Sequence, residues 1–114
     1  MSLMKKSGSL ISQIEVFIIE LDPTIGTEIK KTRPCVVISP DPINRNLTTV
    51  IIAPLTHTIK DFPSRVTCKF NSEEGQVVLD QLRAVDKKRL KKKIGKIDSA
   101  TSELIKIILQ TMFS

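Results

Sequence analysis

The sequence of 114 residues predicts a small α+β domain that is mainly β, with one helix at its C-terminal end. Short apolar runs rich in β-branched residues recur as far as residue 97, and breaks containing proline, glycine or asparagine separate them. Beyond residue 97, apolar side chains recur at helical spacing instead. Short strands followed by one helix are typical of a small, bent antiparallel sheet or SH3-like barrel with the helix packed on it.

The breaks define the expected strands. Pro23 and Gly26 end the first strand, because proline lacks an amide donor and glycine permits a positive φ. Pro40 to Asn44 form a second loop, and Pro54 is expected to end the third strand. The expected strands cover residues 14–21, 35–38, 48–53, 65–70, 76–82 and 91–97, with one helical turn over 86–90. The continuous apolar run over 35–38 predicts a strand covered on both faces.

The last element is expected to be an amphipathic helix. Asp98 precedes it and is a suitable N-cap residue, because its carboxylate can accept hydrogen bonds from the free amides of the first turn. Ile105, Ile108, Leu109 and Met112 then recur on one helical face. This face is expected to pack on the sheet.

No internal repeat or linker divides the chain, so we expect a single domain over residues 1–114, with residues 1–13 as a flexible lead-in. No apolar run approaches the ~18 residues that span a bilayer. The first ten residues also lack the apolar stretch of a signal peptide. We therefore expect a cytoplasmic protein without a membrane partner.

The cysteine pattern argues against a metal site. Cys35 and Cys68 each lie in an apolar, strand-like run, with no CxxC pair and no neighbouring histidine. In such surroundings a reduced thiol behaves as a small hydrophobic side chain. We expect two buried thiols, no disulfide, and no metal or other cofactor.

Charge points to an anionic partner. The formal net charge is +6 and the pI is near 9.6. Much of the excess lies in a basic cluster within residues 87–96, made of Lys87, Lys88, Arg89, Lys91, Lys92, Lys93 and Lys96. Such a cluster attracts polyanions such as nucleic acid, although a solvated face kept for solubility explains it equally well. The chain has four Phe, no Trp and no Tyr, so recognition is expected to rest on charge, hydrogen bonds and shape.

Arg33 stands immediately before a buried strand. Pro34 biases it toward an extended backbone, which fixes where the guanidinium begins. This planar group could bind a phosphate through two parallel hydrogen bonds. Alternatively, Arg33 could anchor its loop by pairing with Glu28 or Asp80.

Further polar residues interrupt apolar runs. Thr56 follows the third strand and could serve in a site or merely cap a turn. Asp80 and Gln81 lie inside the expected strand over 76–82, so at least one should point inward or into a cleft, where a buried carboxylate would need a partner such as Arg33. His57, the sole histidine, is a candidate for substrate contact.

These positions fall within three ordered blocks that resemble the MazF/PemK/Kid toxin family. The blocks are Asp22-Pro23-Thr24-Ile25-Gly26-Thr27-Glu28 with Lys31-Thr32-Arg33-Pro34, then Val50–Thr56 (VIIAPLT), then Val78–Arg83 (VLDQLR) with Val85-Asp86-Lys87. They resemble the family patterns "DPt-G-E…RP", "vvPlT" and "DQiRtvDk". The resemblance runs from about residue 15 to residue 97.

The resemblance implies a toxin of a type II toxin–antitoxin system. Members are sequence-specific endoribonucleases that cleave single-stranded RNA without a metal ion, usually as homodimers with RNA lying across a shared groove. An antitoxin with a disordered, acidic segment occupies that groove. The implied catalytic residues are Arg33, Thr56, Asp80 and Glu28, and the implied RNA-binding residues are Thr27, Lys31, Thr32, His57, Gln81 and Arg83.

Two departures keep other functions open. Ala84 replaces a family hydroxyl, and Val78 stands where some members carry a basic residue. A catalytically inactive RNA-binding relative is therefore one alternative. A non-enzymatic, gyrase-binding toxin such as CcdB is another, because the two groups share this fold.

Overall fold

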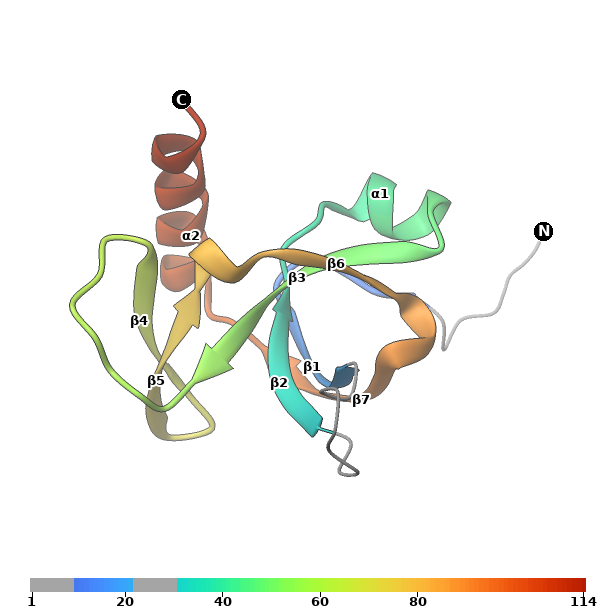
Figure 1. Cartoon of the computed structure of the whole chain (residues 1–114), viewed down its shortest axis with the longest axis horizontal. Helices are drawn as coiled ribbons and strands as arrows, with labels where there is room; N and C mark the ends of the chain where they lie inside the picture. The colour runs from blue at the N-terminus through green and yellow to red at the C-terminus, as the bar shows by residue number, and fades with distance from the viewer. Residues whose placement is uncertain (1–9, 22–30) are drawn as a thin grey trace, which may run out of the picture.

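The computed structural model describes residues 10–21 and 31–114. The described chain forms seven strands: β1 (Glu15–Leu21), β2 (Lys31–Val37), β3 (Thr49–Thr56), β4 (Arg65–Phe70), β5 (Glu73–Val78), β6 (Arg83–Asp86) and β7 (Leu90–Lys96). It also forms two α-helices, α1 (Asp41–Asn46) and α2 (Ser99–Met112), and the short 3₁₀ turns η2 (Leu79–Gln81) and η3 (Lys87–Arg89). The predicted α+β class is confirmed (Figure 1).

A single bent antiparallel sheet organises these elements. Its strand order is β4-β5-β3-β2-β1-β7, and β6 pairs with β3 beside this path. β3 changes partner along its length: β6 pairs with residues 49–52 and β5 with residues 55–56, while β2 pairs with residues 52–54. This change of partner bends the sheet, and Figure 1 shows β3 running from β6 toward β5.

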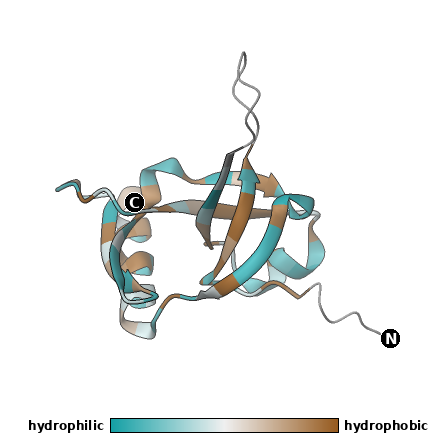
Figure 2. Ribbon diagram, turned by 90° about the horizontal axis from the view of Figure 1, so that it is seen from below, coloured by the Kyte–Doolittle hydropathy of each residue, from teal (hydrophilic) through white to brown (hydrophobic). Residues whose placement is uncertain are grey.

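The strands β2 and β3 separate two cores. Val36, Ala53 and Leu55 belong to the core that lies under α2. Cys35 and Ile52, their neighbours in sequence, belong to a second core on the other side. Because alternate residues of a strand point to opposite faces, a strand with a core on each side is apolar throughout. The prediction for residues 35–38 is confirmed, and Figure 2 shows hydrophobic residues along the central strands.

Helix α2 closes the first core as predicted. The Asp98 carboxylate accepts hydrogen bonds from the Thr101 amide at 3.1 Å and from the Thr101 hydroxyl at 2.7 Å. These bonds lower the pKa of Asp98. Ile105 is buried, and Ile108, Leu109 and Met112 pack against the same core.

The third strand does not end at Pro54, which corrects the prediction. The amide and carbonyl of Ile51 bond to Ser39 and Ile38 on the β2 side. Alternation therefore aims the Pro54 nitrogen at the other edge of β3, where β6 has ended and β5 has not begun. A missing donor costs nothing at that gap, so the strand continues to Thr56.

Two other expectations are also wrong. The loop expected from Pro40 to Asn44 contains helix α1, whose buried Asn44 donates to the Ser39 carbonyl at 2.8 Å. The strand expected over 76–82 is interrupted after Val78 by η2. The interruption is required because β5 and β6 pair with the same edge of β3 at different heights. The turn over 86–90 is confirmed as η3.

Both cysteines are buried and free, as predicted. Within the described residues, no helix is long and apolar enough to cross a membrane.

Docking of α2 through Ile105 is testable by equilibrium unfolding in urea. Ile105 is 1% exposed, whereas Ile107 on the same helix is 55% exposed. Ile105→Ala should lower the free energy of unfolding by about 2–5 kcal/mol, because it removes buried methyl groups and leaves a cavity. The matched control, Ile107→Ala, should change it by less than about 0.5 kcal/mol. Equal effects of the two substitutions would contradict this packing.

Candidate active site

An open cleft of about 370 Å³ lies where the second core meets solvent. Its walls combine three guanidinium groups with a hydroxyl and an amide on an apolar floor. The lining residues are Leu21, Arg33, Pro54, Thr56, Arg65, Val78, Gln81 and Arg83. Guanidinium, hydroxyl and amide groups all donate hydrogen bonds, so the cleft is suited to an anion with several acceptor oxygens.

Strand pairing brings Arg33 and Thr56 to this cleft. Cys35 pairs with Pro54, and the same antiparallel register continued by two residues places Arg33 opposite Thr56. Alternation keeps both side chains on the face of the second core. The position of Arg33 in the cleft is therefore set by the pairing of β2 with β3 and could not be read from the residues around Arg33. The alternative role as a loop anchor on Asp80 is not observed, because Asp80 accepts a hydrogen bond from Ser64 and none from Arg33.

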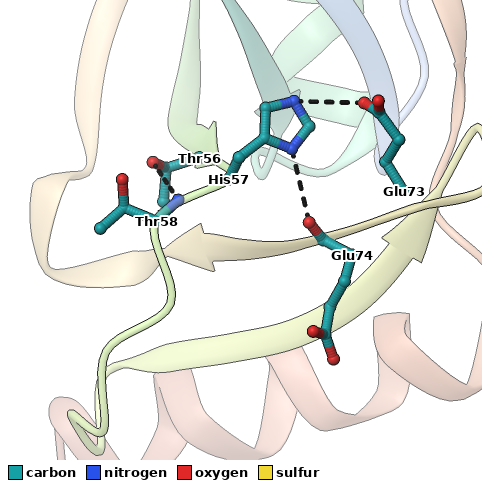
Figure 3. A network of polar contacts seen from close by, with 5 residues as sticks. All are labelled: Thr56, His57, Thr58, Glu73 and Glu74. Carbon is teal, nitrogen blue, oxygen red and sulfur yellow. Dashed lines mark hydrogen bonds and ion pairs between the residues drawn. The ribbon is translucent and has the colours of Figure 1, made fainter.

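Thr56 caps a turn, as Figure 3 shows, and it also lines the cleft. Its hydroxyl oxygen accepts a hydrogen bond from the Thr58 amide at 3.1 Å. That bond occupies one lone pair and leaves the hydroxyl hydrogen available to a ligand. The two interpretations of Thr56 are therefore compatible.

Gly75 leaves room for the backbone of Thr56. It is buried on β5, and a Cβ atom placed there would lie 2.8 Å from the carbonyl oxygen of Thr56. Real Cβ atoms do not approach a backbone oxygen so closely. The position of Thr56 thus depends on a residue without a side chain.

Arg65 is the residue that sequence reasoning missed. It begins β4, and its Nη1 donates to the Thr58 carbonyl at 2.9 Å and to Oε1 of Gln76 at 3.2 Å. Period-two alternation assigns Arg65 to the polar side of a half-buried strand, which is an ordinary solvent position. Only the strand order β4-β5-β3-β2 shows that this side faces Arg33.

Asp80 and Gln81 have separate positions. Both are exposed on η2 rather than inside a strand, which corrects the expectation of a buried carboxylate. Gln81 lines the cleft, as expected for one of the two. Asp80 instead accepts a hydrogen bond from the Ser64 hydroxyl at 2.8 Å. The pairing of Asp80 with Arg33 is therefore not formed.

His57 lies on the opposite face of β3. Its Nε2 is 3.4 Å from a carboxylate oxygen of Glu73, and its Nδ1 is 3.4 Å from the carbonyl oxygen of Glu74 (Figure 3). With Pro34 and Leu55 it lines a smaller cleft of about 130 Å³. The structure thus separates His57 from the Arg33–Thr56 cleft.

The remaining predicted residues fall outside the cleft lining or outside the described chain. Thr32 is exposed on β2 and pairs with Glu20, but it does not line the cleft. Lys31 belongs to β2. Thr27 and Glu28 lie outside the described residues.

Two arginines of the cleft act on the buried thiol of Cys35. Burial raises the pKa of the Cys35 thiol to about 11. The positive charges of Arg33 and Arg83 oppose that rise, so both act on the same buried atom. Within residues 10–21 and 31–114, no group of three His, Cys, Asp or Glu side chains could hold a metal ion.

The basic cluster on η3 and β7 is partly neutralised by β1. Lys93 is 2.6 Å from a carboxylate oxygen of Glu15, and Lys91 is 3.5 Å from one of Glu20. Arg89 donates to the Glu20 carbonyl at 3.3 Å. The cluster therefore stabilises the sheet edge as well as adding positive charge.

Comparison with known proteins identifies the family. The family model described as PemK-like, MazF-like toxin of type II toxin-antitoxin system matches residues 12–113. The chain belongs to this family. A relative named Endoribonuclease MazF, from Staphylococcus epidermidis, is 35% identical over 91 residues, which cover 75% of this chain and 76% of that protein.

Solved structures of MazF toxins share the fold. The crystal structure of MazE-MazF (form II) from Deinococcus radiodurans superposes with a TM-score of 0.79 at 21% identity, covering 91% of this chain and 96% of that chain. An endoribonuclease from a mycobacterial species gives a TM-score of 0.75 at 23% identity, with 91% of each chain covered. This toxin-family chain therefore has the MazF-like fold.

Proposed function

We propose that this MazF-like toxin is an endoribonuclease that cleaves single-stranded RNA. The observation that carries the proposal is one open cleft that Arg33, Arg65 and Arg83 line together with Thr56. This donor set suits the phosphodiester of a polyanion. A relative that is 35% identical bears the name Endoribonuclease MazF.

The chemistry uses the nucleophile that RNA provides. The 2′-hydroxyl oxygen attacks the adjacent phosphorus, the bond to the 5′-oxygen breaks, and a base and an acid remove and return one proton. The products are a 2′,3′-cyclic phosphate and a free 5′-hydroxyl. The protein has to align the attack and stabilise charge on the phosphoryl oxygens.

Arg33 is the main charge stabiliser in this mechanism. Its fork can make two hydrogen bonds to phosphoryl oxygens, and it can also act as the acid. Thr56 donates its hydroxyl hydrogen to a phosphate oxygen. Gln81 and Arg83 bind neighbouring groups of the RNA. A guanidinium group holds its proton tightly and is a poor base, so a carboxylate is needed as base or orienter.

Glu28 is the candidate for that carboxylate. Asp80, the other predicted acid, is the second candidate, because it accepts from Ser64 and is not among the residues that line the cleft. His57, Lys31, Thr32 and Thr27 are proposed to contact RNA beyond the central cleft, as the family resemblance implies.

The reaction is proposed to need no metal ion, because guanidinium groups can supply the positive charge. Partners are proposed to be a second copy of this chain and a cognate antitoxin with an acidic segment. An endoribonuclease from a mycobacterial species has been solved in complex with its cognate antitoxin, with a TM-score of 0.75 to this chain. The proposed compartment is the cytoplasm, where both mRNA and antitoxin occur.

A non-enzymatic poison of gyrase and an inactive RNA-binding relative remain the rivals. The cleft favours the nuclease, because binding a protein surface would not require a threonine hydroxyl in the same cleft as three guanidinium groups. The inactive relative is favoured only by Ala84 and Val78, and Val78 does line the cleft.

The first test incubates purified protein with a long single-stranded RNA in the presence of EDTA and maps the new 5′ ends. Wild type should cut at discrete sites with the chelator present. Arg33→Ala should lower cleavage by about 10²-fold or more, because the charge on the phosphoryl oxygens is no longer stabilised. Arg33→Lys should also cleave RNA poorly, since an ammonium group cannot replace the two parallel hydrogen bonds of a guanidinium group.

Four outcomes would overturn parts of this account. If folded Arg33→Ala cleaves RNA at the wild-type rate, Arg33 has no role in the reaction. Loss of wild-type cleavage in EDTA would refute the metal-free mechanism. RNA binding without cuts would favour the inactive relative, and DNA damage that depends on gyrase would favour the poison.

A second test displaces Thr56 without altering it. Gly75→Ala should reduce the cleavage rate about tenfold or more, because its Cβ pushes the Thr56 carbonyl and displacements near 1 Å cost up to ~10²-fold. The control is Glu74→Ala, which alters the exposed neighbouring residue and keeps its backbone carbonyl. Circular dichroism should show both variants folded. Unimpaired cleavage by folded Gly75→Ala would show that this contact does not position Thr56.

A further inference from the structure

Arg65 occupies a separate position in the cleft from Arg33. Arg65 pairs with Val78 across β4 and β5, and the order β4-β5-β3-β2 then places it three strands from Arg33. At about 4.8 Å per strand, their backbones are roughly 14 Å apart. Both side chains nevertheless line the same cleft.

The guanidinium of Arg65 is held in place near the β3–β4 loop. Its Nη1 bonds to Thr58 in that loop and to Gln76, which is buried. Gln76 in turn accepts from the Lys60 amide and donates to the Lys60 carbonyl, each at 3.0 Å. The ring of Phe62 lies 5.5 Å from the guanidinium carbon. These contacts fix the group and prevent it from extending to Arg33.

The held guanidinium still has donors to offer. Its hydrogen bonds to described residues come from Nη1 alone, so both hydrogens of Nη2 remain for a ligand, whereas Nε is buried without a partner and faces away from solvent. No ion pair joins Arg65 to an acid within the described chain; its two Nη1 acceptors are neutral oxygens. A cation with unused donors in an open cleft is suited to an anionic ligand.

We propose that Arg65 binds the RNA phosphate that neighbours the scissile one, and that Gln76 is the positioning residue that aims it. This inference rests on the proposed endoribonuclease function. Arg33 serves the reacting phosphate, and Arg65, displaced along the cleft and tethered to the β3–β4 loop, serves the next phosphate of the same strand. This contact determines the position of the RNA strand in the cleft and takes no part in the reaction at phosphorus.

The test measures RNA affinity as a function of salt. The probe is an RNA oligonucleotide around one mapped cut, 2′-O-methylated at the nucleotide whose hydroxyl attacks, so that it binds without being cleaved. Arg65→Ala should weaken binding about tenfold or more. It should also reduce the slope of log affinity against log salt by ~0.7, the value for one phosphate contact on a single strand. A merely structural role would not change that slope.

Two further variants sharpen the result. Arg65→Lys should keep the wild-type salt slope, because the charge remains, but recover only part of the affinity, because the fork is lost. Arg45→Ala is the matched control, since Arg45 is exposed at the end of α1 and does not line the cleft. It should leave affinity and slope unchanged.

The outcomes distinguish this inference from the proposed function. If wild type cuts RNA but folded Arg65→Ala binds the probe with wild-type affinity and slope, the assignment of Arg65 is wrong and the nuclease stands. The same holds if Arg45→Ala reduces the slope equally. If wild type neither cuts nor binds RNA, the proposed function fails, and the role of Arg65 fails with it.

Discussion

The pairing of β2 with β3 is the interaction on which the rest of this structure depends. These two strands lie between the two cores, so each buries both of its faces. The register that pairs Cys35 with Pro54 also determines which side chains emerge where the buried rows end. On the face of the second core, those side chains are Arg33 and Thr56. A slip of one residue would turn one of the two toward the core under α2 and separate it from the other, so packing and site geometry share one constraint.

The bend of the sheet supplies the other walls of the cleft. Because β3 exchanges β6 for β5 as its partner, the chain must turn at η2, which carries Gln81 to the cleft. Pro54 lies at the exchange, where no donor is needed. The opposite face of β3 ends differently, with His57 beside Glu73 and an apolar floor. One strand thus separates a cationic cleft from a smaller, mixed one.

Local sequence patterns predicted the helices and strands better than the contacts between them. Asp98 and the Ile105 face were identified correctly because capping and helical periodicity are local properties. Pro54 and Asp80 were misplaced because their environments depend on which strands pair with β3. Arg33 and Thr56 looked ordinary in isolation, and only the ordered family blocks connected them. Arg65 belongs to none of those blocks, so nothing short of the strand order could assign it to the cleft.

The central claim is that the Arg33–Thr56 cleft cleaves RNA through the substrate's own 2′-hydroxyl. The most direct measurement places a single 2′-deoxynucleotide at one mapped cut in an otherwise unchanged RNA and analyses the ends formed there. The account predicts that cleavage stops at that position alone, and that the unmodified RNA gives a 2′,3′-cyclic phosphate and a 5′-hydroxyl. Continued cutting at the deoxynucleotide, or a 5′-phosphate on the product, would contradict it.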